Sequence, residues 1–185
     1  ASIDESGGNS RFAGGVMRFA YSTVEELQQL TDIPEDEARN TDWDSNSVDE
    51  FYDDLYRVTA FRTDPNLSEA LITKSFPTMV WLRKQGASFT PNYANQSAIV
   101  NGKRKFFGRM PIEVSGGGAG LVAFLDKAAE KAGITVHYAT RAKSLILDGE
   151  QVVGVRANQG GQAVEFGLRG VGHEQQPRQL RRAVQ

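Results

Sequence analysis

The sequence contains no cysteine and only two histidines, His137 and His173, among its 185 residues. Without cysteine there can be no disulfide scaffold, no thiol catalysis, no Cys-ligated zinc and no iron–sulfur cluster. Two histidines are also too few for a histidine-rich metal site. We therefore predict no metal-binding residues.

Long apolar runs and an excess of basic residues are missing as well. No apolar run approaches the roughly 18 residues of a membrane-spanning helix. Residues 1–5 resemble no signal peptide, so we expect a cytoplasmic protein. Lys plus Arg number 21 against 23 for Asp plus Glu, which gives a net charge of −2. This balance argues against a dedicated nucleic-acid-binding protein.

The composition that remains is that of a globular protein, with 39% hydrophobic and 24% charged residues. Acidic residues concentrate in the stretch 32–54, where the one basic residue is Arg39. This stretch has no glycine for the sharp turn of a calcium loop. We interpret its acids as solvated helix faces and loops rather than as a cation site.

Helical signals dominate the first half of the chain. Possible capping boxes at 22–25 and 47–50 precede apolar residues at helical spacing. Helical spacing resumes at Asn66, and we expect Pro77 to separate that helix from a second one that stops at Gly86. The aromatic stretch 87–107 predicts a β-hairpin whose turn is Asn101-Gly102.

The second half predicts a strand–helix–strand arrangement followed by an antiparallel meander. The glycine run 116–120 opens a helix that ends at Gly133. Four strands are expected after it, with glycine-containing turns between the last three, at residues 134–138, 142–147, 152–156 and 163–166. The expected fold class is therefore α/β, and we interpret residues 169–185 as a disordered or artefactual tail.

Two glycine-rich segments, 7–15 and 116–120, could bind a phosphate group through backbone amides. Neither fits the dinucleotide fingerprint G-x-G-x-x-G, because Leu121 occupies the third glycine position of the second segment. An NAD-type nucleotide-binding site is therefore disfavoured. From the residues alone, turns and close packing explain these glycines better than nucleotide binding does.

The remaining candidate residues are few. His137 is better explained as a packed strand residue than as a base, and His173 lies in the expected tail. Residues 103–107, Lys-Arg-Lys-Phe-Phe, are better explained as a hairpin with an exposed basic face than as an anion site. Arg11 and Arg18 flank the first glycine segment and could bind a substrate carboxylate by bidentate pairs.

The order of these segments resembles the fumarate reductase and succinate dehydrogenase flavoprotein superfamily. Residues 7–15, Gly-Gly-Asn-Ser-Arg-Phe-Ala-Gly-Gly, resemble the loop that runs under the flavin. A second block is similar through Gly117-Gly118, residues 133–136, Thr140-Arg141-Ala142 and residues 145–155. Within the superfamily, residues 14–21 look most like FAD-dependent tricarballylate dehydrogenases.

The resemblance implies a partial FAD-binding domain of the glutathione-reductase-like Rossmann type over residues 1–168. Its expected parts are a helical insertion at about 22–86, a hairpin at about 87–108, and a βαβ unit with the meander at about 111–167. The cofactor FAD would be contacted, by the same resemblance, at Gly8, Asn9, Ser10, Ala13, Gly14, Gly15 and Ala142.

The sequence also departs from the family pattern. It lacks the family's first strand with G-x-G-x-x-G, and residues 166–172 substitute poorly for a later V-V-L-A-T/C-G-G strand. We therefore expect an internal fragment, inactive alone and without catalytic residues. The parent protein would be a FAD-dependent dehydrogenase or reductase that transfers a hydride between flavin and a small di- or tricarboxylate, with a possible electron-acceptor protein. The alternative is a stand-alone α/β binding or interaction module.

Overall fold

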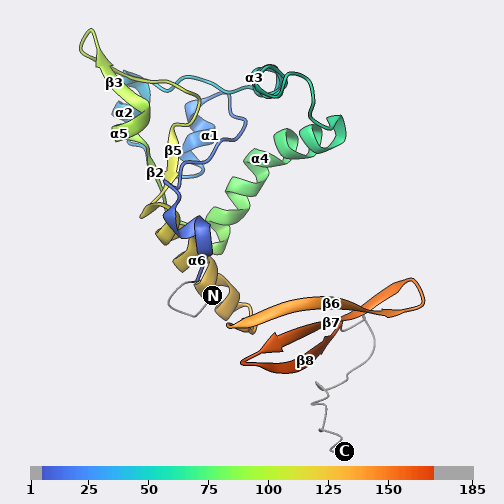
Figure 1. Ribbon diagram of the computed structural model, residues 1–185. Coiled ribbons are helices and arrows are strands. Elements are labelled where there is room, and N and C mark those ends of the chain that lie inside the picture. Colours follow the sequence, from blue (N-terminus) through green and yellow to red (C-terminus); the bar gives the residue numbers. More distant parts are fainter. Residues whose placement is uncertain (1–5, 169–185) are drawn as a thin grey trace, which may run out of the picture. The chain divides into compact units, whose positions relative to one another are not determined.

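The computed structural model describes residues 6–168 (Figure 1), and their contacts divide them into two compact units. One unit, Gly7–Ile134, contains the helices and two small sheets. The other contains Ser6 and residues 135–168 and consists mainly of one antiparallel sheet. The expected tail at 169–185 and His173 lie outside the described residues.

Capping boxes begin two of the early helices. The 3₁₀ helix η2 (Gly8–Phe12) is followed by helices α1 (Val24–Gln28), α2 (Glu35–Asn40) and α3 (Val48–Thr59). At α3 the expected box forms, since the amides of Ser47 and Glu50 each bond to the other's side chain. At α1 the box forms one residue later than expected, with Glu26 accepting from the Thr23 amide.

Helix α4 (Pro65–Gln85) is one continuous helix of 21 residues, so the expected break at Pro77 is wrong. Proline removes the N–H that would bond to the carbonyl of Thr73. Both residues are exposed, so water can satisfy that carbonyl. Ile72, before the proline, and Met79, after it, are 0% and 4% exposed. Their burial in the core holds the helix on both sides of Pro77.

Two small sheets complete this unit. Strand β2 (Phe89–Pro91) pairs with β5 (Ile112–Val114), and the short helix α5 (Tyr93–Gln96) lies between them in sequence. In the other sheet, β3 (Ser97–Val100) and β4 (Lys103–Phe106) form a hairpin with the expected turn, but it begins at Ser97 rather than at residue 87, because β2 and α5 occupy the first part of the expected range. Asn101 and Gly102 have φ of 52° and 78°, as its two-residue turn requires. Strand β1 (Thr41–Asp42) adds to β4 in parallel, which the sequence did not predict.

The aromatic core of this unit lies between these sheets and the helices. Trp43 stacks on Phe106 with ring centroids 4.6 Å apart, and Phe19 packs beside Tyr21 at 5.5 Å. Side chains from segments far apart in sequence complete it, including Leu27, Leu30, Met79, Phe89 and Ile112. The core therefore joins the segment after the first glycine cluster to α1, α4, β2, β4 and β5.

Helix α6 (Gly117–Lys131) forms as predicted and ends with Gly133 in the left-handed conformation, φ 71°. The strand expected at 134–138 does not form, so the strand–helix–strand unit is wrong at this point. Ile134 and Val136 are 60% and 49% exposed. The described part of the chain supplies no neighbouring strand for them, and a lone strand leaves its peptide groups unpaired.

The second unit is the expected antiparallel meander of β6 (Thr140–Asp148), β7 (Gln151–Gln159) and β8 (Gln162–Gly167). The turn after β7 is Gly160-Gly161, as predicted. The turn after β6 is centred on Gly149-Glu150, because Asp148 still pairs with Gln151. The described residues thus form a mixed α/β structure.

We expect Pro77→Ala to raise the free energy of unfolding by about 1–3 kcal/mol, because alanine restores a helical hydrogen bond to Thr73. Urea unfolding followed by circular dichroism measures this. As a control on the same helix, Leu67→Ala should change the value by less than about 0.5 kcal/mol, since surface substitutions have small effects and Leu67 is 70% exposed. An unchanged or lower stability for Pro77→Ala would contradict the explanation of the unbroken helix.

Candidate functional site

The two glycine segments that the sequence singled out lie against each other in the unit of residues 7–134. The Gly118 amide, in the first turn of α6, donates to the Ala13 carbonyl at 2.8 Å. The Val114 amide donates to the Gly15 carbonyl at 2.9 Å. Segments about a hundred positions apart in the chain are thereby joined through their backbones.

Close backbone approach explains several of these glycines. A Cβ on Gly118 would lie 2.0 Å from the Ser10 carbonyl oxygen, and a Cβ on Gly15 would lie 2.6 Å from the Gly117 Cα. Gly15 also has φ of +81°, which disfavours other residues. The interpretation of the glycines as packing residues is therefore correct at these positions.

Gly14 differs from its neighbours. A Cβ built on it meets nothing within 4 Å, and its φ is not in the left-handed region. The fold itself therefore has no need of glycine at position 14. A glycine that the chain does not need for its own packing is what a ligand lying against the backbone requires.

The other predicted residues of the loop face outward. Asn9, Ser10 and Ala13 are exposed, and so is Gly8, beside which a Cβ would also meet open space. The Ser10 amide donates to the Gly7 carbonyl at 3.0 Å, which closes the turn into η2. The loop is thus held from the α6 side and open on the side away from it.

Arg18 is already engaged within the protein, and Arg11 is exposed on η2. The Arg18 guanidinium donates to the Asp54 carboxylate and, at 3.0 Å, to Asn46 Oδ1. It also lies over the Phe51 ring, 4.8 Å from the centroid. These contacts hold the segment after the glycine loop against α3, so Arg18 is part of the scaffold in this structure.

Asp54 is the centre of an ion-pair network that spacing could not reveal. Besides Arg18, its carboxylate accepts from Arg57 at 3.0 Å and from Arg109 at 3.1 Å. Arg109 also pairs with Glu50 at 3.2 Å. Hydrogen bonds from the Arg18 and Arg57 side chains lower the pKa of Asp54 to about 2. For Glu50 and Asp54, the interpretation as merely solvated acids is wrong.

Ala142 belongs to the other unit, on β6. It is exposed and pairs with Ala157 just before a bulge in the strand. Within the described residues β6 is an edge strand, so half of its peptide groups point away from β7. Its predicted role depends on backbone rather than side-chain contacts, and this edge leaves such backbone groups accessible.

The remaining candidates have structural roles. His137 is exposed and lies against the Phe166 ring, 4.8 Å between centroids. In the basic stretch of β4, Lys105 pairs with Asp42 at 3.0 Å and Arg104 lies over the Tyr93 ring. Residues 6–168 contain no cluster of three or more potential metal ligands. No helix in that range has the length and apolarity needed to cross a membrane.

We expect Gly118→Ala to destabilise the protein by about 2–4 kcal/mol, because its methyl group would collide with the loop backbone. Gly14→Ala, in the same site, should change the free energy of unfolding by less than about 1 kcal/mol. Thermal and urea unfolding of both variants provides the comparison. Equal stabilities would show that the loop does not pack on α6 as described.

We expect Asp54→Asn to lower the free energy of unfolding by about 1–3 kcal/mol at pH 7, because Arg18 loses its charged partner and Arg109 keeps only Glu50. The folded pKa lies below the usual value of about 3.9, so the carboxylate stabilises the fold above that pH. This contribution disappears as the pH falls toward about 2, and the variants should converge. Urea unfolding between pH 3 and 7 tests this, with the exposed Asp53→Asn as control. A constant difference across that range would contradict the assignment.

The family comparison covers the residues of this site. A family model described as an FAD binding domain matches residues 3–171, nearly the whole chain. A search of curated proteins finds no match. The matched range includes the glycine loop, α6 and the meander. The chain belongs to the FAD-binding domain family of the fumarate reductase and succinate dehydrogenase flavoproteins, a family of FAD-dependent oxidoreductases.

Proposed function

We propose that the loop of residues 8–15 lies against the flavin and pyrophosphate of FAD in a FAD-dependent dehydrogenase or reductase. The observation that supports this most directly is Gly14, a glycine beside open space that the folded chain does not need. The backbone on both sides of it is held rigidly by α6 and β5. A rigid, side-chain-free surface is suited to the face of a planar ring.

We assign the cofactor contacts to the loop rather than to the first turn of α6. The first helical turn could attract a phosphate through its free amides. The Gly118 amide, however, already bonds to Ala13. The exposed polar groups of Asn9 and Ser10 remain for the cofactor, and the accessible edge of β6 at Ala142 supports backbone contacts with the adenine part.

When bound, FAD would supply the hydride chemistry, and these residues would position it. We assign no catalytic residue to the described part of the chain. The proposed substrate is a small di- or tricarboxylate, by resemblance to the tricarballylate dehydrogenases. Arg11, which is exposed on η2, remains a candidate for binding it. A separate protein as electron acceptor is part of the same proposal.

We also propose that these 185 residues alone bind FAD weakly and turn over no substrate. The sequence contains no G-x-G-x-x-G segment, and in such folds that segment holds the pyrophosphate. Each charge-assisted hydrogen bond lost weakens binding by about 1.5–3 kcal/mol. A dissociation constant near or below about 1 μM in a fluorescence titration with FAD would contradict this proposal.

Amide NMR spectra of the 185-residue chain at millimolar FAD test the loop assignment even if binding is weak. We expect FAD to shift the amide signals of residues 8–15. Gly14→Val should abolish these shifts while the remaining spectrum is preserved, because the branched side chain fills the space beside the backbone. The matched control is Gly167→Val, since Gly167 in β8 also has open space beside it and an ordinary φ.

Two results would contradict the assignment. One is an unchanged set of FAD shifts in Gly14→Val. The other is a loss of the shifts in both valine variants, which would indicate a general loss of structure instead of a blocked site.

A further inference from the structure

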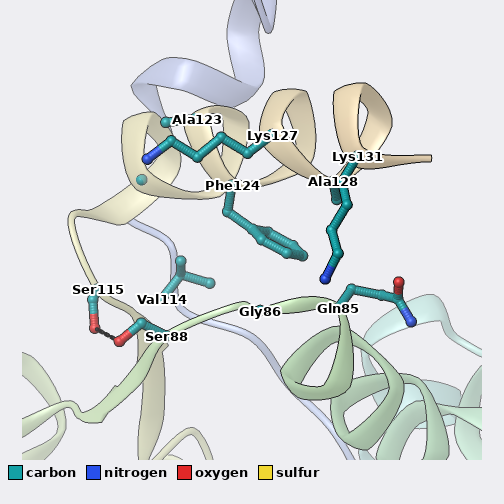
Figure 2. A pocket seen from close by; sticks show the side chains of 11 residues that line it. Gln85, Gly86, Ser88, Val114, Ser115, Ala123, Phe124, Lys127, Ala128 and Lys131 are labelled. Atoms are coloured by element: carbon teal, nitrogen blue, oxygen red, sulfur yellow. Dashed lines mark hydrogen bonds between the residues drawn. The ribbon is translucent and has the colours of Figure 1, made fainter. Parts of the chain in front are cut away.

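A cavity of about 360 Å³ lies along α6, from Gly120 to Lys131, within the unit of residues 7–134. Its other walls are Gln85-Gly86 at the end of α4, Ser88 just before β2, and Val114-Ser115 at the end of β5. Figure 2 shows Phe124 and Lys131 extending from α6 toward the Gln85-Gly86 end. None of residues 8–15 lines this cavity, so it is separate from the proposed FAD loop.

The charged groups that line the cavity are all positive. Lys127 and Lys131, one helical turn apart on α6, line it, and none of its lining residues is acidic. Neither lysine forms an ion pair with a carboxylate of residues 6–168. Like charges at this spacing destabilise a helix slightly. The negative end of the helix dipole offsets that cost, but it does not explain why the facing wall has no acid.

Ser88 and Ser115 add hydroxyl groups to the wall opposite the helix. Their oxygens are 3.1 Å apart and share one hydrogen bond. Because each hydroxyl carries one hydrogen, the pair retains a second hydrogen that it can donate to a ligand. The side chains of Phe124 and Val114 give the cavity an apolar part beside these donors (Figure 2).

We propose that this cavity binds a small organic anion. Figure 2 shows the ammonium groups of Lys127 and Lys131 at different ends of the cavity. The carboxylate or phosphate group of the ligand would therefore meet one lysine directly and be attracted by the other at longer range, and its apolar body would contact Phe124. The volume is at the lower end of the roughly 300–1,000 Å³ of ligand pockets, which suits a ligand with one ring and is too small for a dinucleotide. This site is independent of the proposed flavin function.

Binding of simple probes to the 185-residue chain tests the proposal without any flavin. The probes are phenyl phosphate, benzoate, and benzyl alcohol as the uncharged ligand of similar size, titrated by NMR. We expect at least one anion to bind about fivefold or more tighter than benzyl alcohol. A preference for phenyl phosphate would assign a phosphate ligand, and a preference for benzoate would assign a carboxylate.

Lysine variants locate the binding. Lys127→Met and Lys131→Met, which keep an unbranched side chain but remove its charge, should each weaken binding of the preferred anion by about threefold to tenfold. Lys74→Met, on the exposed face of α4 and outside the cavity, is the matched control and should leave binding unchanged.

Three results would overturn the proposal. Equal affinity for benzyl alcohol and both anions would make the cavity a merely apolar crevice. Equal weakening by Lys74→Met would indicate non-specific attraction to surface charge. Inorganic phosphate binding as tightly as phenyl phosphate, with benzoate no tighter than benzyl alcohol, would show that the apolar wall takes no part.

Discussion

The hydrogen bond from the Gly118 amide to the Ala13 carbonyl, at 2.8 Å, is the contact on which the arrangement of the site depends. It forms only because neither Gly118 nor Gly15 has a side chain, since a Cβ at either position would collide with backbone. The glycines of the two segments therefore have two roles. Those between the loop and α6 permit the contact, and Gly14, on the open side, leaves a bare backbone surface. Close packing and the proposed cofactor binding are complementary explanations of one cluster.

The segment that leaves the loop is held by charge as well as by burial. Arg18 pairs with Asp54, and Arg109 reaches the same carboxylate from the loop before β5. Phe19 and Tyr21, the next aromatic residues, are 1% and 2% exposed and enter the core. The loop is thus anchored by α6 on one side and by the Asp54 network and the aromatic core on the other. Such anchoring reduces the ordering that a bound ligand would have to impose on the loop.

The unit of residues 7–134 presents two chemically different surfaces on either half of α6. The first turn of the helix packs against the glycine loop and uses the backbone. Its last turns carry Lys127 and Lys131 beside a cavity with an apolar wall. The first surface suits a flat ring held without side chains, and the second suits a compact anion held by charge. One helix can serve both because its two ends differ in dipole sign and in residue size.

Local features were predictable from the sequence by itself, because their causes lie within a few residues. The Asn101-Gly102 turn, the box at Ser47, the end of α6 at Gly133 and the meander follow from backbone preferences and short-range hydrogen bonds. The motif order also sufficed to indicate the FAD-binding family.

Tertiary structure decided what depends on distant partners. Pro77 stays within a helix because the core holds both sides of it, and residues 134–138 form no strand because the described chain gives them no neighbour. Asp54 pairs with arginines up to 55 positions away in the sequence. The open space beside Gly14 is defined only when the loop has folded onto α6. No local pattern encodes such contacts, because their energy comes from groups that only the folded chain brings together.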